Sequence, residues 1–269
     1  MRERFASLRN ALNATAIGNT VAVAYSGGLD SRFLVHAALL AGFSLRVFHV
    51  RGPHVPAHEK HYALNWAQRN GVALTVLDFD PLETPALRQN PKDRCYHCKR
   101  AVFAAILHAA RTELGESAIL CDGTNISDAG EYRPGRKALQ ELAVRSPLAE
   151  AGFTKDDIRI LAAQSGMENP GQAAQPCLLT RFGYGAVLSA ALLSRVDAGE
   201  EAVRRVLTAR GKPNTPFRLR YENAVTPALH VAFEPEEALA AELATALGDA
   251  GFAGAPVRVV KFLSGYFDS

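Results

Sequence analysis

The sequence lacks both a long apolar run and a large excess of charge of one sign. None of its 269 residues belongs to an apolar stretch that approaches the roughly 20 residues needed to span a bilayer, so we expect no membrane-spanning helix. The formal net charge of +3 is too small to indicate a nucleic-acid-binding surface, and it fits a local basic pocket for an anionic small molecule equally well. A hydrophobic content of 48% and a charged content of 21% indicate a soluble globular protein without long disordered tails.

Cysteine is also scarce, and the N-terminus lacks the pattern of a secretory leader. Arg2, Arg4 and Arg9 are followed neither by an uninterrupted apolar core nor by a small-residue cleavage site. We therefore expect no signal peptide and a cytoplasmic protein. In that compartment the four cysteines should be reduced. We therefore interpret their spacing in terms of metal binding, redox activity or catalysis, and not first in terms of disulfides.

Strand and helix patterns alternate from about residue 20 to about residue 165. Four short apolar segments predict strands: "VAVAY", "LRVFHV", "VALTVLDF" and "SAILCDGTN". The segments between them have apolar residues at helical spacing, and Gly42 and Gly71 end two of the helices. The alternation predicts an α/β fold, with an open and mostly parallel sheet covered by helices on both faces. We assign this domain to residues 1–170.

The pattern changes after a loop rich in glycine and proline, "NPGQAAQPCLLTRFGYG". A long helix, "LSAALLSRVDAGEEAVRRVLTARG", leads into two strands of alternating pattern, "FRLRYE" and "ALHVAFE". A helix at about residues 236–250 and a strand in "PVRVVKFL" follow. We therefore expect a second, smaller α+β domain over residues 171–269.

The segment "SGGLDS" follows the first predicted strand directly. In an open parallel sheet, ligands bind beyond the carboxyl ends of the strands. There Gly27 and Gly28 allow a tight turn whose amides, with the helix N-terminus, can hold a phosphate. Ser26 and Ser31 add hydroxyl groups, and Asp30 is suited to hold Mg²⁺ between phosphates. The alternative is an ordinary turn in which Asp30 or Ser31 caps the helix, and the segment matches neither a Walker A motif nor a dinucleotide fingerprint.

The cysteines fall into three settings. Cys95 and Cys98 in "NPKDRCYHCKRAVF" share one face at the start of a predicted helix, where the helix dipole and basic neighbours favour thiolates. That pair could be redox-active, half of a zinc site or two half-buried packing residues. Cys177 lies in a polar, glycine-bounded loop, an unusual place for a packing cysteine. Cys121 ends a predicted strand, so we expect it in the core.

These motifs carry a family resemblance at two levels. "SGGLDS" resembles the PP-loop of the ATP pyrophosphatases, which cleave ATP between its α- and β-phosphates. The segments "RCYHCK", "CDGTNISD", "EYRPGRKAL", "VRSPLAEAGFTKDDIR" and "PCLLTRFGYG", in that order, are similar to the LarE family of ATP-dependent sacrificial sulfur transferases. This closer resemblance covers roughly residues 5–225 and weakens after them.

The resemblance implies an enzyme that uses ATP to insert sulfur. In the family, ATP adenylylates a carboxylate of pyridinium-3,5-biscarboxylic acid mononucleotide and pyrophosphate is released. Sulfur then displaces AMP and leaves a thiocarboxylate, a step in building the nickel-pincer cofactor. A carboxylate is a poor electrophile, so adenylylation supplies the leaving group that a sulfur nucleophile needs. The implied partners are this small nucleotide and further copies of the chain in a homo-oligomer, with a hexamer as a candidate, and neither nucleic acid nor membrane.

Two sulfur sources occur in the family. One type gives up the sulfur of a single cysteine at the position of Cys177, which becomes dehydroalanine. The other type holds a [4Fe–4S] cluster with three cysteines and transfers an additional sulfide. The chain has Cys95 and Cys98 as well as Cys177, so the resemblance implies the cluster, in which three thiolates leave one iron open. The alternative is Cys177 as sacrificial donor, with the other two as relays or as a zinc site.

Nucleotide contacts beyond the phosphate loop are expected in the turn after the fourth predicted strand. Asp122, Thr124 and Asn125 follow that strand in "CDGTNISD", at the edge of the sheet where ligands bind. The same residue types are also common as turn and cap residues, and that alternative stays open.

We expect three catalytic residues, Asp30 of the phosphate loop, Cys177 of the family pattern, and Arg181, which lies four residues after Cys177 and is a candidate to bind the substrate phosphate. Substrate-binding candidates are arginines, whose planar guanidinium suits phosphate and carboxylate, and one glutamate: Arg133, Arg136, Arg218, Arg220 and Glu200. The two arginines of "FRLRYE" alternate and so share one face of a strand. For Arg133 and Arg136 a solvated surface charge is an equal alternative. For Glu200, which could position Mg²⁺ or substrate, a solvated helix face is the favoured interpretation.

The chain departs from the family pattern in two places. Arg32 and Phe33 follow "SGGLDS" where the family usually has small or aliphatic residues, and "NPGQAAQ" replaces a Trp–Lys–Pro run before Cys177. The first departure predicts altered contacts at the phosphate pocket, and the second leaves a paralogue with another acceptor as an alternative. Two further alternatives are an amide-forming ligase similar to NAD synthetase, which has no use for three cysteines, and a nucleotide-binding sensor without pyrophosphate release.

Overall fold

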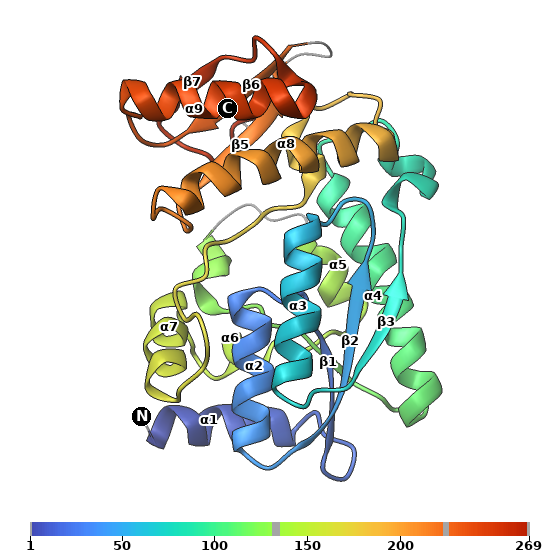
Figure 1. The fold of residues 1–269 in the computed structure, drawn as a ribbon. Coiled ribbons are helices and arrows are strands. Elements are labelled where there is room, and N and C mark those ends of the chain that lie inside the picture. The colour runs from blue at the N-terminus through green and yellow to red at the C-terminus, as the bar shows by residue number, and fades with distance from the viewer. Residues whose placement is uncertain (1, 131–134, 223–225, 268–269) are drawn as a thin grey trace. The chain divides into compact units, whose positions relative to one another are not determined.

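A four-stranded, all-parallel sheet forms the centre of the N-terminal part of the chain (Figure 1). Its strands lie in the order β3–β2–β1–β4, so the first strand of the chain is central. The strands are β1 (Thr20–Ala24), β2 (Ser44–Arg51), β3 (Leu74–Asp78) and β4 (Leu120–Cys121). The predicted α/β class with a parallel sheet is confirmed.

The computed structural model describes residues 2–130, 135–222 and 226–267. The chain forms two compact units. The first consists of residues 1–52, 59–79 and 93–175, and the second of residues 53–58, 80–92 and 176–269. Two short segments of the N-terminal half therefore belong to the second unit, a contribution that the sequence did not indicate. The predicted division into domains at residue 170 stays a prediction.

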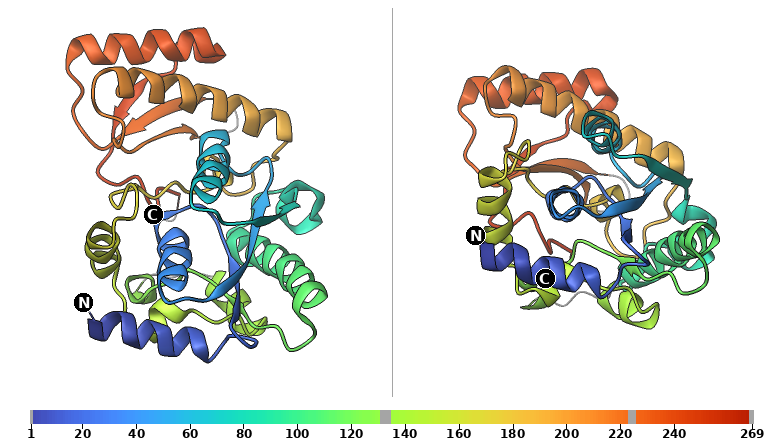
Figure 2. Two further views of the ribbon diagram at one scale, coloured as in Figure 1. Left: turned by 60° about the horizontal axis from the view of Figure 1, so that its bottom comes forward. Right: turned by 90° about the horizontal axis from the view of Figure 1, so that it is seen from below.

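Helices cover both faces of the parallel sheet (Figure 2). Alternate residues of β1 point to opposite faces. Val21 and Val23 pack into one apolar core with α1, α2 and α3, whereas Ala22 and Ala24 pack into another with α4. These helices are α1 (Arg2–Asn13), α2 (Leu29–Leu40), α3 (Ala57–Arg69) and α4 (Arg94–Leu114). Helices on both faces were predicted from the alternation of strand and helix patterns.

The alternation itself ends earlier than predicted. After β4 the chain forms three helices, α5 (Gly135–Glu141), α6 (Pro147–Glu150) and α7 (Lys155–Gln164). Arg145 lies beside β4 in a single parallel bridge to Cys121, and its backbone exchanges hydrogen bonds with Leu120 and Asp122 at 2.9 Å. Pro147, at the start of α6, has no amide hydrogen to extend this pairing. One bridge therefore stands where a fifth strand would lie.

The second unit contains a three-stranded mixed sheet in the order β5–β6–β7. β5 (Phe217–Tyr221) and β6 (Pro227–Val231) are antiparallel, and β7 (Val257–Val259) runs parallel to β6. Two helices, α8 (Ala190–Ala209) and α9 (Glu237–Leu247), share one apolar core with this sheet. A Cβ atom on Gly199 of α8 would lie 2.5 Å from a Leu219 methyl carbon of β5, so any larger residue there would displace side chains between helix and sheet.

Apolar side chains are buried within these cores. Among the helices of the described residues, none combines the length and hydropathy needed to cross a membrane. Cys121 is fully buried in the core of the first unit, as predicted, and its thiol donates to Thr15 Oγ1 at 3.2 Å. Burial raises the pKa of this thiol to about 12, so at neutral pH Cys121 is not a nucleophile.

Candidate active site

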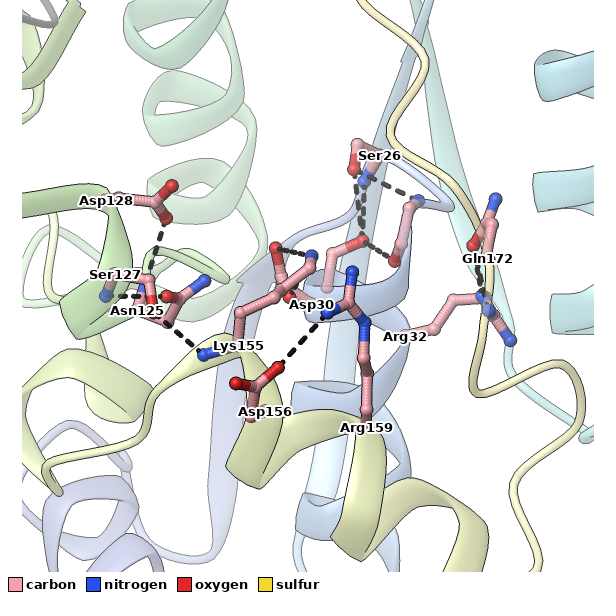
Figure 3. A network of polar contacts seen from close by, with 12 residues as sticks. Ser26, Asp30, Arg32, Asn125, Ser127, Asp128, Lys155, Asp156, Arg159 and Gln172 are labelled. Atoms are coloured by element: carbon pink, nitrogen blue, oxygen red, sulfur yellow. Dashed lines mark hydrogen bonds and ion pairs between the residues drawn. The ribbon is translucent and has the colours of Figure 1, made fainter. Parts of the chain in front are cut away.

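The predicted phosphate loop connects β1 to α2 at the carboxyl end of a central strand. Two hydroxyl groups shape it. Ser31 Oγ lies 3.1 Å from Ser26 Oγ, accepts the Ser26 amide at 3.2 Å and donates to the Gly28 carbonyl at 3.1 Å. These bonds fold the loop onto the first turn of α2 (Figure 3). A loop of this form at a helix N-terminus is favourable for an anion.

Two glycines allow the close packing around this loop. Gly27 has φ +83°, and a Cβ atom there would lie 2.3 Å from Ala63 Cβ. A Cβ atom on Gly123, in the turn after β4, would lie 2.7 Å from the Ser31 amide nitrogen. Both positions therefore exclude any other residue without a shift of the backbone. The turn after β4 rests directly on the phosphate loop.

The ammonium group of Lys155 binds the carboxylate of Asp30, a contact that the sequence analysis did not predict. Its two carboxylate oxygens each lie 2.7 Å from Lys155 Nζ, and the two side chains are about one quarter exposed (Figure 3). Burial raises the pKa of Asp30, although Lys155 opposes that shift. Lys155 begins α7, and its amide donates to Ser127 Oγ at 3.0 Å. The pair combines oxygen ligands suited to Mg²⁺ with an ammonium group suited to phosphate.

The turn after β4 uses its predicted nucleotide-binding residues for its own hydrogen bonds. Asp122 accepts from Ser146 Oγ at 2.6 Å, from the Thr124 amide at 3.2 Å and from the Thr124 hydroxyl at 2.5 Å. Asn125 Oδ1 accepts the Ser127 amide at 2.9 Å. These contacts are those of turn residues, which was the alternative interpretation. Contact with a nucleotide stays a prediction for Asp122, Thr124 and Asn125.

Arg32 points away from the phosphate loop that it follows (Figure 3). Its guanidinium group donates to Gln172 Oε1 and to the carbonyl oxygens of Glu168 and Asn169. The side chain is fully buried. The hydrogen bonds of this side chain are therefore with the segment before Cys177, and an effect of Arg32 on the phosphate pocket stays a prediction.

The candidate cysteines are divided between the two units. Cys95 and Cys98 lie in the first turns of α4, as predicted, and are exposed and half-buried respectively. Cys177 precedes a short 3₁₀ helix, Leu178–Arg181, and is half-buried. Each unit by itself therefore holds at most two of the three thiols. Within the described residues no group of three or more potential metal ligands is gathered, and the three-cysteine site stays a prediction.

Glu200 is buried against Arg181, which corrects the interpretation of a solvated helix face. Its oxygens accept from Arg181 Nε at 2.6 Å and Nη2 at 2.9 Å, and the two side chains are 2% and 0% exposed. One oxygen also accepts the Leu219 amide of β5 at 2.9 Å. Burial opposes ionisation, but Arg181 and these hydrogen bonds hold the pKa of Glu200 below its ordinary value. The pair links the 3₁₀ helix after Cys177 to α8 and β5.

Arg218 and Arg220 occupy alternate positions of β5 and are both buried, as the pattern of "FRLRYE" predicts for one strand face. Burial lowers their pKa values to about 9 and about 10, so both stay cationic at neutral pH. Arg220 bonds to His230 Nδ1 at 3.1 Å and to the Leu263 carbonyl, while its Nε has no hydrogen-bond partner among the described residues. Buried guanidinium groups of this kind are suited to bind an anion.

The remaining arginine candidates lie near the gap in the described residues. Arg133 falls within residues 131–134, outside the part of the chain that the structure describes. Arg136 lies in the first turn of α5 and is half-buried. Their roles in substrate binding stay predictions.

The chain was compared with known proteins. It is 30% identical over 207 residues to the pyridinium-3,5-bisthiocarboxylic acid mononucleotide synthase of Lactiplantibacillus plantarum, an alignment that covers 76% of this chain and 72% of that protein. The chain belongs to the LarE family. Uncharacterised proteins of Synechocystis, at 33% over 68% of both chains, and of Methanocaldococcus jannaschii, at 28% over 75% of this chain and 76% of the other, are further relatives. No protein-family model matches the chain.

Asn90 is a residue of this LarE-family chain that the sequence interpretation missed. It is fully buried with φ +45°, and its Nδ2 donates to the carbonyls of Phe182 and Gly183 at 3.0 Å and of Leu179 at 3.4 Å. Asn90 thereby fixes the turn that follows Cys177. Asn90 is the first residue of "NPKDRCYHC", a segment that we interpreted only for its cysteines. Lys155 lay likewise in a quoted segment, and its partner is 125 residues away.

Proposed function

We propose that the protein is an ATP-dependent sulfur transferase that acts on pyridinium-3,5-biscarboxylic acid mononucleotide. The observation that carries the proposal is a phosphate loop with Asp30 and Lys155 beside it, in a chain of the LarE family. A carboxylate oxygen of the substrate attacks the α-phosphorus of ATP, and pyrophosphate leaves. A sulfur nucleophile then attacks the acyl carbon, AMP leaves, and a thiocarboxylate results.

The phosphate loop would bind ATP through its amides, the hydroxyls of Ser26 and Ser31, and Lys155. Asp30 would hold Mg²⁺, which when bound neutralises charge on the phosphates. The Asp30 carboxylate is a suitable ligand for Mg²⁺, because both of its oxygens already contact one cation, Lys155 Nζ. Binding of Mg²⁺ by Asp30 would release the ammonium group of Lys155 toward a phosphate oxygen, so the pair exchanges partners without leaving either charge uncompensated.

The buried arginines of the second unit would bind the anionic end of the substrate. Arg181, Arg218 and Arg220 are all at least 95% buried, and the fully buried carboxylate beside them is Glu200. A phosphate or carboxylate of the substrate would add a negative charge complementary to these buried guanidinium groups, whose planar donors suit both anions. Arg181 is held rigidly by Glu200, so its guanidinium contributes to the field of the site with little loss of side-chain entropy.

Sulfur would be delivered by one of two routes, and both depend on Cys177. As sacrificial donor, its thiolate displaces AMP to form a thioester. Loss of the Cys177 α-proton and cleavage of its Cβ–S bond then leave the thiocarboxylate and dehydroalanine. In the second route Cys95, Cys98 and Cys177 would hold a [4Fe–4S] cluster, which supplies an open iron for a sulfide. Thiols on one helix turn suit two ligands of such a cluster. The three-cysteine pattern favours this second route.

The proposal is tested with the whole protein, ATP, Mg²⁺ and the biscarboxylic acid mononucleotide. We expect AMP and pyrophosphate in equal amounts, only in the presence of that carboxylate, and a thiocarboxylate product by mass spectrometry. Formation of ADP and phosphate would overturn the PP-loop assignment. Amide formation from ammonia that survives loss of all three cysteines would support the ligase alternative, and ATP binding without pyrophosphate release would support the sensor.

Replacement of Lys155 by methionine should slow pyrophosphate release by about 10- to 100-fold, because a preorganised cation at the phosphates is lost. Arg159→Met is the matched control. Arg159 lies one turn further along α7 and pairs with the exposed Asp156 at 3.2 Å (Figure 3). It acts on Asp30 only through a weaker charge interaction, so its loss should change the rate by less than about threefold. Equal rates for both variants in a pyrophosphate-release assay would show that Lys155 does not act on ATP.

A further inference from the structure

Arg32 is a fully buried cation whose hydrogen bonds go to neutral oxygens. Its Nε and Nη2 donate to Gln172 Oε1 at 3.1 and 2.8 Å, Nη1 donates to the Glu168 carbonyl at 2.7 Å, and Nη2 also donates to the Asn169 carbonyl at 3.0 Å. Gln172 in turn donates to Glu59 Oε2 at 3.4 Å. Four charge-assisted bonds therefore tie one side chain of α2 to the segment at 168–172.

Two aromatic rings complete the environment of this guanidinium group. Its carbon lies 5.1 Å from the ring centre of Tyr62 and 5.7 Å from that of Trp66, both on α3. Contacts of a cation with aromatic faces offset part of the cost of its burial. Burial nevertheless lowers the pKa of Arg32. A buried arginine held in this way is fixed in position, because all three guanidinium nitrogens donate hydrogen bonds and two aromatic rings lie beside the group.

The segment that Arg32 holds is the last part of the first unit before the chain enters the second. The first unit ends at residue 175, and Cys177 is the second residue of the last segment of the second unit, 176–269. Three residues, 173–175, lie between Gln172 and that boundary. Arg32 also directly follows Ser31 of the phosphate loop, and its own amide donates to the Gly28 carbonyl at 3.0 Å. One turn of α2 thus carries the phosphate loop and the anchor of the chain leading to Cys177.

We propose that Arg32 is a positioning residue that fixes the start of the Cys177-bearing segment relative to the phosphate loop. This inference rests on the proposed function, in which the acyl adenylate forms at the loop and sulfur arrives with the Cys177 segment. A loosely tethered nucleophile reacts more slowly than one held near its target. Arg32 and "NPGQAAQ" are the two departures of this chain from the family pattern. They then serve the same positioning role, since Arg32 bonds Gln172 of that segment.

The test compares Arg32→Met and Gln172→Leu with Arg69→Met. Arg69 is a matched control, because it bonds Glu168 of the same segment at 3.0 Å but is about half exposed. Two half-reactions are measured, substrate-dependent pyrophosphate release and thiocarboxylate formation. Amide hydrogen exchange over residues 168–175 and quenching of Trp66, the single tryptophan, report the state of the anchor without any turnover.

We expect both anchor variants to keep pyrophosphate release within about threefold while thiocarboxylate formation falls by about 10- to 100-fold. Exchange over 168–175 should be at least about tenfold faster, and Trp66 more accessible to a quencher. Arg32→Lys should recover part of the sulfur transfer, and the double variant Arg32→Met with Gln172→Leu should be no worse than Arg32→Met alone.

Other outcomes overturn the inference and are distinguishable from failure of the proposed function. If Arg32→Met and Gln172→Leu lower both half-reactions equally, in proportion to the loss of folded protein, Arg32 is a stabilising residue only. If neither half-reaction changes while exchange over 168–175 rises, the anchor does not position the sulfur donor. A wild-type protein without pyrophosphate release would refute the proposed function itself, and the hydrogen-exchange result would then still show whether Arg32 holds the segment.

Discussion

Cys177→Ala should abolish thiocarboxylate formation and leave substrate-dependent pyrophosphate release within about threefold of the wild-type rate. The reason is that, in the proposed function, adenylylation takes place at the phosphate loop, whereas both proposed routes of sulfur delivery require the Cys177 thiolate. The residue is half-buried and precedes the Leu178–Arg181 turn, which Asn90 fixes through three carbonyl groups. Alanine leaves that backbone arrangement intact, so the loss falls on the chemistry. Mass spectrometry of the product and a pyrophosphate assay measure the two half-reactions.

Cys121→Ala is the matched control for this prediction. Burial raises the pKa of the Cys121 thiol to about 12, and the side chain contacts the core rather than a loop. Sulfur transfer should therefore persist in this variant. If Cys177→Ala still forms the thiocarboxylate, or if Cys121→Ala abolishes it without loss of folded protein, Cys177 is not the sulfur-delivering residue.

The same variants separate the two sulfur sources. If a cluster is held by three cysteines, anaerobically purified wild-type protein should contain iron and sulfide, and both should be lost in Cys95→Ala, Cys98→Ala and Cys177→Ala. If Cys177 is sacrificial, the protein should contain neither and should lose the mass of H₂S after turnover, with dehydroalanine at residue 177. Wild-type protein that turns over with unchanged Cys177 and without iron would contradict both routes.

Local patterns in the sequence predicted the parts of the fold whose causes are local. Strands β1, β2 and β3 were visible as short apolar runs, and the loop "SGGLDS" has the glycines that its turn requires, as the contact at Gly27 shows. The burial of Cys121 followed from its place at the end of an apolar strand. Arg218 and Arg220 share a face because a strand alternates.

Contacts between distant segments could not be predicted in the same way. Lys155 meets Asp30 across 125 residues and Arg32 meets Gln172 across 140, and no local pattern specifies either pair. Glu200 is a different case, because its position in the sequence of α8 already indicated burial. It falls on the apolar stripe of α8 with Leu193, Val196, Val203 and Leu207, at the spacing of a buried helix face. A charged residue on such a stripe indicates a buried partner, here Arg181.

Glu200→Gln should lower the free energy of unfolding at neutral pH by about 3–5 kcal/mol, because removal of one partner leaves a buried charge without compensation. Arg181 would lose its carboxylate at 2.6 Å, and Arg218 would lose the negative charge that favours its protonated form. Glutamine has the same shape, and its oxygen can still accept the Leu219 amide. Its amide nitrogen replaces the oxygen that accepts from Arg181 Nη2, so the loss combines the charge with one hydrogen bond. Urea unfolding followed by circular dichroism measures it.

The pH dependence of this loss gives a second, independent check. The pKa of folded Glu200 lies below its ordinary value of 4.5. Its contribution to stability is therefore fully present above that value and is lost as the pH falls through the folded pKa. Wild-type protein should lose stability on acidification more steeply than Glu200→Gln, and the difference between the two should narrow. A difference that stays constant down to the pH at which Glu200 is protonated would contradict an ionised pair.

Glu242→Gln provides the surface counterpart in the same unit. Glu242 bonds Arg210, and the two side chains are 46% and 43% exposed, so water can solvate both charges when the pair is broken. This variant should unfold at nearly the same urea concentration as the wild type. Equal losses for Glu200→Gln and Glu242→Gln would show that burial does not strengthen the Arg181–Glu200 pair. A large loss confined to Glu200→Gln would show that the buried arginines need a negative charge, which is the property that we propose the anionic substrate exploits.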